Sequence, residues 1–200
     1  MDALTRWHLK TADMQKRDRV NIDTVMDARC LGIVRRFRQA GVLVGVWEIT
    51  GESGIPGFLC RILPETASEI SGIRPASGMG CHLSRDVALL RALTEAAQSR
   101  LTFISGARDD LSRDDYRKFL SAEEHAKWRE GLLDKSCAQK DFQKIQSHET
   151  RSLDQDLNIL LKLLKDSGTE EVVAIDLTKP EFGIPVARVI IPGMEGELSL

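Results

Sequence analysis

A polar row on an otherwise apolar stretch is the first feature that could do chemistry. Arg91, Glu95 and Gln98 are spaced by four and then three residues in "ALLRALTEAAQSR", so a helix would place them on one side. A guanidinium fork suits phosphate oxygens, and a carboxylate suits Mg²⁺. Two interpretations remain open: the row binds a phosphate together with a metal or a sugar hydroxyl, or Arg91 and Glu95 form an ordinary surface pair.

The residues around this row predict how it is presented. A stripe of mostly apolar residues should face the core, and the small residues Ala88 and Ala92 flank the polar row. Small or apolar neighbours are typical of a row that lines a cleft. The predicted core stripe consists of Leu83, Val87, Leu90, Thr94, Ala97 and Leu101, widened by Leu89, Leu93 and Ala96.

The segment in front of this helix, "SGMGCH", offers two further kinds of site. Its glycines predict a loop whose backbone N–H groups approach an anion at the helix N-terminus, or one that serves only as a tight turn. Cys81 and His82 are adjacent, a spacing that rarely lets both residues bind one metal. A nucleophile at Cys81 would require a histidine from position 8, 125 or 148 to fold onto it.

The composition indicates a folded globular chain and narrows its partners. The 200 residues are 42% hydrophobic, which is enough for one core. The 28 basic and 30 acidic residues give no overall charge that favours nucleic acid or an anionic membrane. No apolar run approaches the roughly 20 residues that span a bilayer, and the first residues lack the apolar region of a secretion signal. We therefore expect a cytoplasmic protein without a nucleic-acid or membrane partner.

The four cysteines, at positions 30, 60, 81 and 137, lie at least 21 residues apart. This spacing contains no CxxC pair, which argues against a zinc site and against a disulfide scaffold. We expect buried, reduced thiols.

The elements that position the row form a repeated pattern. Each of two units has a helix that ends at a glycine, a strand, a turn containing "GIP" and a second strand. The helix with the polar row, predicted over 84–101, lies between them. Two such units can cover one sheet, so we expect one α/β domain over residues 1–200, with helices layered on a mixed β-sheet. The unit helices are predicted over 24–40 and 152–167, and the unit strands over 42–49, 57–63, 171–177 and 185–191.

The connection between the units is strongly charged. Residues 103–150 hold 19 charged residues out of 48, so this segment should be mostly solvated. Serine followed by acidic residues predicts helix starts at 112–115 and 121–124.

Several motifs together resemble the YcaO family, especially the members that work beside TfuA proteins. The longest is "ALLRALTEAAQSRLTFISGARDD" at 88–110, preceded by "GMGCH". It is accompanied by "MDALTRW" at the start, "GIPGFLCRI" at 54–62 and "IPGMEG" at 191–196. The resemblance spans nearly the whole chain, but it covers only the C-terminal half of a YcaO domain.

Complete members of this family bind ATP and Mg²⁺ and phosphorylate the backbone amide oxygen of a peptide. A nucleophile can then form an azoline or, with a sulfide donor, a thioamide. The resemblance implies ATP-dependent modification of a peptide backbone, by a cyclodehydratase or a thioamidation enzyme. It also implies that Arg91 and Glu95 are contacts for the nucleotide phosphates and the metal, with Glu95 as the metal ligand. Gln98 is a weaker cofactor-binding candidate on the same helix face.

The sequence departs from the family at the ATP site, and its C-terminus "GELSL" also lacks the proline-rich tail of the azoline-forming members. The glycine-rich, lysine-containing strip and the two glutamate clusters that complete the family's ATP and Mg²⁺ site have no counterpart here. The resemblance therefore implies a chain that is inactive alone. Expected partners are a peptide or protein substrate, a TfuA-like protein, and an N-terminal half or a second copy. The alternatives are a non-catalytic module that binds a peptide or a partner, and a truncated relic.

Overall fold

The expected α/β class is confirmed in the computed structural model, which describes residues 7–8, 10–66, 75–106, 112, 121–134, 136 and 139–194. The helices are α2 (Ala12–Arg17), α3 (Ala28–Gln39), α4 (Arg85–Ile104), α6 (Ala122–Leu133) and α7 (Leu153–Asp166). The strands are β1 (Val20–Asn21), β2 (Val42–Glu48), β3 (Gly57–Pro64), β4 (Ala76–Cys81), β5 (Lys140–Asp141), β6 (Val173–Asp176) and β7 (Ala187–Ile190). Short 3₁₀ helices occupy Ile22–Thr24 and Phe142–Lys144.

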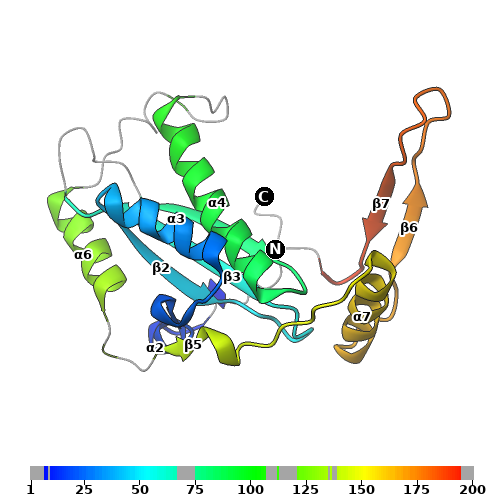
Figure 1. The fold of residues 1–200 in the computed structure, drawn as a ribbon, viewed down its shortest axis with the longest axis horizontal. Coiled ribbons are helices and arrows are strands. Elements are labelled where there is room, and N and C mark those ends of the chain that lie inside the picture. The colour runs from blue at the N-terminus through cyan, green and yellow to red at the C-terminus, as the bar shows by residue number, and fades with distance from the viewer. Residues whose placement is uncertain are drawn as a thin grey trace.

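An antiparallel sheet with the order β2-β3-β4 lies at the centre of the molecule. β2 and β3 form where expected, because each is an apolar run bounded by glycine or proline. Cys60 in β3 lies opposite Val46 in β2 and Gly78 in β4. Helices α3 and α4 pack on one face of this sheet, as Figure 1 shows, and α6 packs against β2.

Strand β3 is buried on both faces, which explains its nearly continuous apolar sequence. Successive side chains point to opposite faces of a strand. Phe58, Cys60 and Ile62 therefore join the core beneath α3 and α4, whereas Leu59 and Leu63 join a second core. The other members of that second core are Trp7, Trp47, Ile49 and Leu132.

The first helix begins later than expected. Residues 22–24 form a 3₁₀ turn, and α3 starts directly after Asp27. The Asp27 carboxylate accepts hydrogen bonds of 3.0 Å from the backbone N–H groups of Arg29 and Cys30, which makes it the N-cap. Met26, which lies inside the predicted helix 24–40, precedes this cap and is 78% exposed.

The buried side of α4 also differs from the expected stripe. Thr94 and Leu101, predicted to face the core, are exposed. The cause is β4, which lies so close to the helix that the small side chains turn inward. The buried residues of α4 are Ala88, Leu89, Ala92, Leu93 and Ala96.

The second helix and strand pair form a separate part, residues 153–190, which we call the arm. The Ser152 hydroxyl accepts a hydrogen bond from the backbone N–H of Gln155, so α7 begins at its expected cap. β6 and β7 pair only with each other within the described residues. The single sheet shared by both units is not formed, because β4 takes the place beside β3. Figure 1 shows the arm standing apart from the body, the described residues 7–145.

The charged connection is described only in part. A capping box at Ser121 and Glu124 starts α6, as the sequence predicts. The other expected helix start lies, apart from Ser112, outside the described residues. Among the helices described, none has both the length and the apolar character needed to cross a membrane.

Candidate functional site

The polar row lies on helix α4, which packs unusually close to strand β4. A Cβ atom added at Gly78 would lie 2.1 Å from the backbone nitrogen of Ala96, and one at Gly80 would lie 2.0 Å from the backbone oxygen of Ala88. Only glycine fits at either position. The loop predicted from the "SGMG" sequence is therefore wrong, because this segment is part of strand β4 and pairs with β3.

Arg91, Glu95 and Gln98 lie together, exposed, on α4. The Arg91 Nη1 atom donates a 3.0 Å hydrogen bond to the backbone oxygen of Cys81. Within the described part of the chain, no ion pair joins Arg91 to Glu95, and the side chains of Glu95 and Gln98 make no hydrogen bond. The structure thus presents the row to its surroundings and does not form the ordinary surface pair.

The surroundings of Cys81 and His82 are those of residues that support the fold, and not those of a reactive thiol or a metal site. His82 Nδ1 accepts a 2.9 Å hydrogen bond from the backbone N–H of Ser84, whose own side chain makes no capping bond for α4. Burial raises the pKa of the Cys81 thiol, and nearby Arg91 offsets this only in part. A reactive thiolate requires a lowered pKa. His125 lies elsewhere, 2.9 Å from the backbone oxygen of Pro64.

A complete metal site is absent from the part of the chain that the structure describes. No three His, Cys, Asp or Glu side chains there are placed to hold one ion. Mg²⁺ in nucleotide sites is usually held by one or two carboxylates together with phosphate oxygens and water. Glu95 fits the role of one such carboxylate, beside an arginine suited to phosphate.

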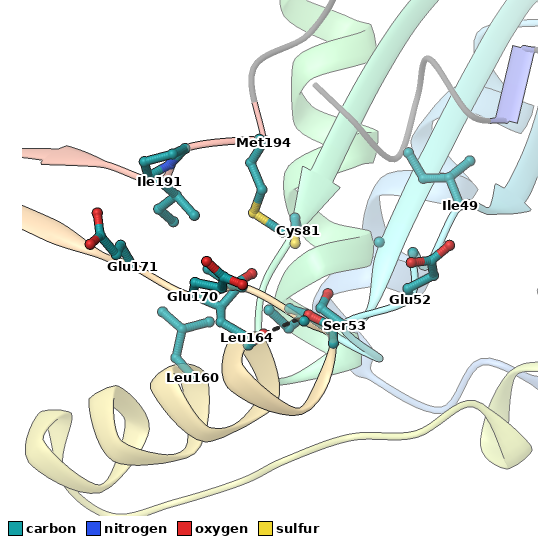
Figure 2. A pocket seen from close by; sticks show the side chains of 18 of the residues that line it. Ile49, Glu52, Ser53, Cys81, Leu160, Leu164, Glu170, Glu171, Ile191 and Met194 are labelled. Atoms are coloured by element: carbon teal, nitrogen blue, oxygen red, sulfur yellow. Dashed lines mark hydrogen bonds between the residues drawn. The ribbon is translucent and has the colours of Figure 1, made fainter.

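A cavity of about 740 Å³ lies between the arm and the body. In Figure 2, Met194 reaches toward Cys81, Glu170 and Glu171 approach from the arm, and Glu52 approaches from the body. The described lining is otherwise largely apolar and contains no Lys, Arg or His. Cys81 connects the cavity with the polar row on α4, because its side chain lines the cavity and its backbone oxygen accepts the hydrogen bond from Arg91.

Sequence reasoning missed this cavity. The "GIP" turns and the glycine that ends each unit helix were visible in the sequence, but they did not indicate that residues more than 100 positions apart would face each other. The three carboxylates give the lining a negative charge, which does not suit a triphosphate. The polar row on α4 therefore remains the better candidate for phosphate.

Comparison with known proteins identifies the family. Residues 2–195 match the family model of the YcaO cyclodehydratase, ATP- and Mg²⁺-binding. An uncharacterized protein of Methanothermobacter thermautotrophicus is 33% identical over 164 residues, which are 82% of this chain and 42% of that protein. An uncharacterized protein in the tfuA 3′ region of Rhizobium leguminosarum bv. trifolii is 31% identical over 201 residues, which are 99% of this chain and 47% of that protein.

Solved structures share the fold. A heterocyclase in complex with substrate and cofactor has a TM-score of 0.73 at 24% identity, covering 97% of this chain and 25% of that one. The YcaO protein of Methanopyrus kandleri bound with AMPPCP and Mg²⁺ has a TM-score of 0.69 at 17% identity, covering 95% and 48%. The chain thus spans less than half the length of the relatives and structures that it matches here. From the family match over residues 2–195, we conclude that the chain belongs to the YcaO family.

Proposed function

We propose that this chain forms part of an ATP- and Mg²⁺-dependent site that modifies the backbone of a peptide or protein substrate. The observation that carries this proposal is the exposed row of Arg91, Glu95 and Gln98 in a member of the YcaO family. Arg91 contacts a nucleotide phosphate, Glu95 is one ligand of Mg²⁺, and Gln98 is a further contact with the nucleotide.

The position of Arg91 supports its role. A guanidinium has five N–H donors in a planar fork. The Cys81 backbone oxygen takes one of them and fixes the side chain, so less conformational freedom is lost when the remaining donors bind a phosphate. Glu95 lies one helical turn away, a spacing at which two side chains can share a ligand.

The chemistry would come from the nucleotide. When bound, ATP supplies the phosphoryl group that activates a substrate amide oxygen, so that a nucleophile can form an azoline or a thioamide. Positioning and charge neutralisation provide most of the catalysis in phosphoryl transfer, and these are the tasks assigned to Arg91 and Glu95. The complex of the M. kandleri protein with AMPPCP and Mg²⁺ supports this class of ligand.

The cavity beside the row is the proposed place of the peptide. Its volume of about 740 Å³ accommodates a short peptide segment, and its largely apolar walls can bury peptide side chains. Glu52, Glu170 and Glu171 would favour a segment without acidic side chains.

The proposed site also needs more Mg²⁺ ligands than the described residues bring together. The relatives are more than twice as long as the segments that match this chain. We therefore assign the remaining Mg²⁺ ligands to a polypeptide equivalent to their unmatched part, and we expect this chain alone to be inactive. The relative from the tfuA 3′ region supports a TfuA-like protein as a further partner.

The Mg²⁺ dependence of ATP binding tests the assignment of Glu95. We would use a chimera, the R. leguminosarum relative with its matching segment replaced by this chain. Glu95→Gln should weaken ATP binding at least about tenfold in the presence of Mg²⁺ and leave binding in EDTA unchanged. Glu130→Gln, at an exposed position on α6, is the matched control. Equal Mg²⁺-dependent affinity in the Glu95→Gln and unaltered chimeras would remove Glu95 from the metal site.

A non-catalytic binding module is the second candidate function, favoured by the exposed apolar residues of the arm. It predicts peptide or partner binding that responds neither to ATP nor to Mg²⁺. Such binding by a chimera that fails to bind ATP would support it over the catalytic proposal.

A further inference from the structure

Exposed aliphatic side chains line one face of the β6-β7 hairpin. Directly opposed residues of an antiparallel pair share a face. Val173 and its partner Ile190 therefore lie on the same face as Ile175. Leu177 donates a 2.8 Å backbone hydrogen bond to Val186, and this pair continues the face. Four of these five aliphatic side chains are exposed, at 40% to 50%, and Ile190 is half-buried. Arg188, the partner of Ile175, adds one positive charge to the same face.

Other apolar side chains of the arm are also exposed to solvent. Leu153, Leu157 and Leu161 form a stripe along α7 and are 85%, 54% and 39% exposed. Val189, on the opposite face of the hairpin, is also exposed. In the described part of the chain, eleven of the seventeen exposed large hydrophobic side chains belong to the arm. Exposed apolar residues so concentrated in one segment mark a surface that another polypeptide covers.

The β6-β7 hairpin of the arm makes few contacts with other described parts of the chain. The extensive contacts of β6 and β7 within the described residues are with each other. An isolated two-stranded hairpin is at best marginally stable in water. Its backbone geometry is nevertheless well defined, with a four-residue antiparallel register. A covering partner would supply the burial that the hairpin lacks.

The comparisons indicate which polypeptide this is. The family match over residues 2–195 includes the arm, so the arm belongs to the family's domain. The solved M. kandleri structure has about as much polypeptide again beyond the part that matches this chain. We infer that the apolar surface of the arm docks the polypeptide equivalent to the unmatched part of the curated relatives. This inference rests on the proposed function only for the idea that the same polypeptide completes the nucleotide site.

The arrangement around the cavity places such a docked polypeptide beside the proposed nucleotide site. Strand β4 pairs with β3 on one side, and no other described strand pairs with its second edge. Met79, Gly80 and Cys81 of this strand line the cavity together with Leu160 and Leu164 of α7. A polypeptide seated on the arm therefore lies close to the free edge of β4. It also comes near Arg91, which is bonded to Cys81.

Hydrogen exchange tests the inference without nucleotide. In this chain alone, the amides of β6 and β7 should exchange at nearly the rate of an unfolded peptide. In the chimera they should exchange on the order of 100-fold more slowly, because the hairpin is then covered. A double variant, Val173→Thr with Ile175→Thr, retains β-branched residues suited to a strand and should remove most of that protection. Met26→Ser, which changes an exposed apolar residue of the body, should not.

Three results would overturn the inference. Slow exchange of the hairpin in a monomeric chain would show that the arm needs no occupant. Slow exchange that appears only as the chain dimerises with rising concentration would assign the surface to a second copy. A chimera that unfolds cooperatively but leaves the hairpin unprotected would show that the unmatched part does not cover the arm. ATP binding is scored separately, so a protected hairpin in a chimera that does not bind ATP contradicts only the proposed function.

Discussion

The Arg91 guanidinium is bonded to the backbone oxygen of Cys81 at 3.0 Å, and not to Glu95 one turn further along the same helix. This bond ties the end of β4 to the outer side of α4. It leaves the Glu95 carboxylate without an ion-pair partner among the described residues. The two charged groups are thus close in sequence and separate in their interactions.

Removing the Arg91 side chain should have little effect on folding. Its single hydrogen bond is exposed, so Arg91→Ala is expected to lower the free energy of unfolding by about 1 kcal/mol or less. Urea denaturation of the chain measures this change. A loss of several kcal/mol would show that Arg91 is a structural residue, and any loss of ligand binding in that variant would then have no bearing on the site.

Gly78 and Gly80 should be intolerant of any side chain. A Cβ atom at either position would lie within 2.1 Å of α4 backbone atoms, and a helix backbone cannot yield as a flexible side chain does. Gly78→Ala is expected to lower the free energy of unfolding by about 3 kcal/mol. Gly32→Ala is the control, because nothing lies within 4 Å of its added Cβ. It is expected to stabilise α3 by about 0.5–1 kcal/mol. Equal effects of the two substitutions would contradict the close contact.

The cysteine thiols should react slowly or not at all with alkylating reagents. Burial raises the pKa of the Cys30 thiol to about 12 and raises that of Cys60 strongly as well. Partial desolvation of its sulfur also raises the pKa of Cys81, although this residue is the exposed one of the three described cysteines. With Cys137 replaced by serine, iodoacetamide at pH 7 should therefore label only Cys81, at least about tenfold more slowly than in the unfolded chain. Labelling faster than in the unfolded chain would indicate an activated Cys81 and would reopen the cysteine nucleophile.

An ion-pair cluster should make stability depend on alkaline pH. Lys140 Nζ lies 2.7 Å from Glu48 and 3.0 Å from Asp18. Burial alone would lower the pKa of Lys140, but hydrogen bonds to these carboxylates and their charges raise it overall. A raised lysine pKa stabilises the fold below the unfolded value of about 10.4. This contribution disappears as the pH rises through the folded value.

Lys140→Met should therefore lower the free energy of unfolding by about 1–2 kcal/mol at pH 7. The difference from the unaltered chain should shrink above about pH 10.4. Lys127→Met, which removes an exposed pair with Glu123, should change stability by less than about 0.5 kcal/mol at either pH. A difference for Lys140→Met that stays constant between pH 7 and pH 11 would contradict this account.

Local signals in the sequence predicted most of the elements correctly. Apolar runs, caps and terminal glycines placed β2, β3, α6 and α7. Strand β4 was missed because its glycines are typical of a loop. In the structure these glycines instead let the strand backbone approach the backbone of helix α4 closely. The same error explains why the buried face of α4 was only partly predicted: Leu89, Leu93 and Ala96 are buried as expected, but Ala88 and Ala92 pack against the strand in place of Thr94 and Leu101.

The candidate site could be predicted only in part. The spacing of Arg91, Glu95 and Gln98 was enough to place them together, because a helix is a local structure. The bond from Arg91 to Cys81 and the cavity between the arm and the body depend on tertiary packing. The cavity is lined by segments near residues 52, 81, 170 and 194. The periodicity of a single segment cannot predict that four distant segments lie together.

Calorimetric titration of ATP in the presence of Mg²⁺ tests the central claim most directly. It compares the chimera, the chimera with Arg91→Ala, and this chain alone. We predict binding by the chimera, at least about tenfold weaker binding by the Arg91→Ala chimera, and no measurable binding by this chain alone. Equal ATP affinity in the chimeras with and without Arg91 would contradict the assignment of the α4 row to the nucleotide site.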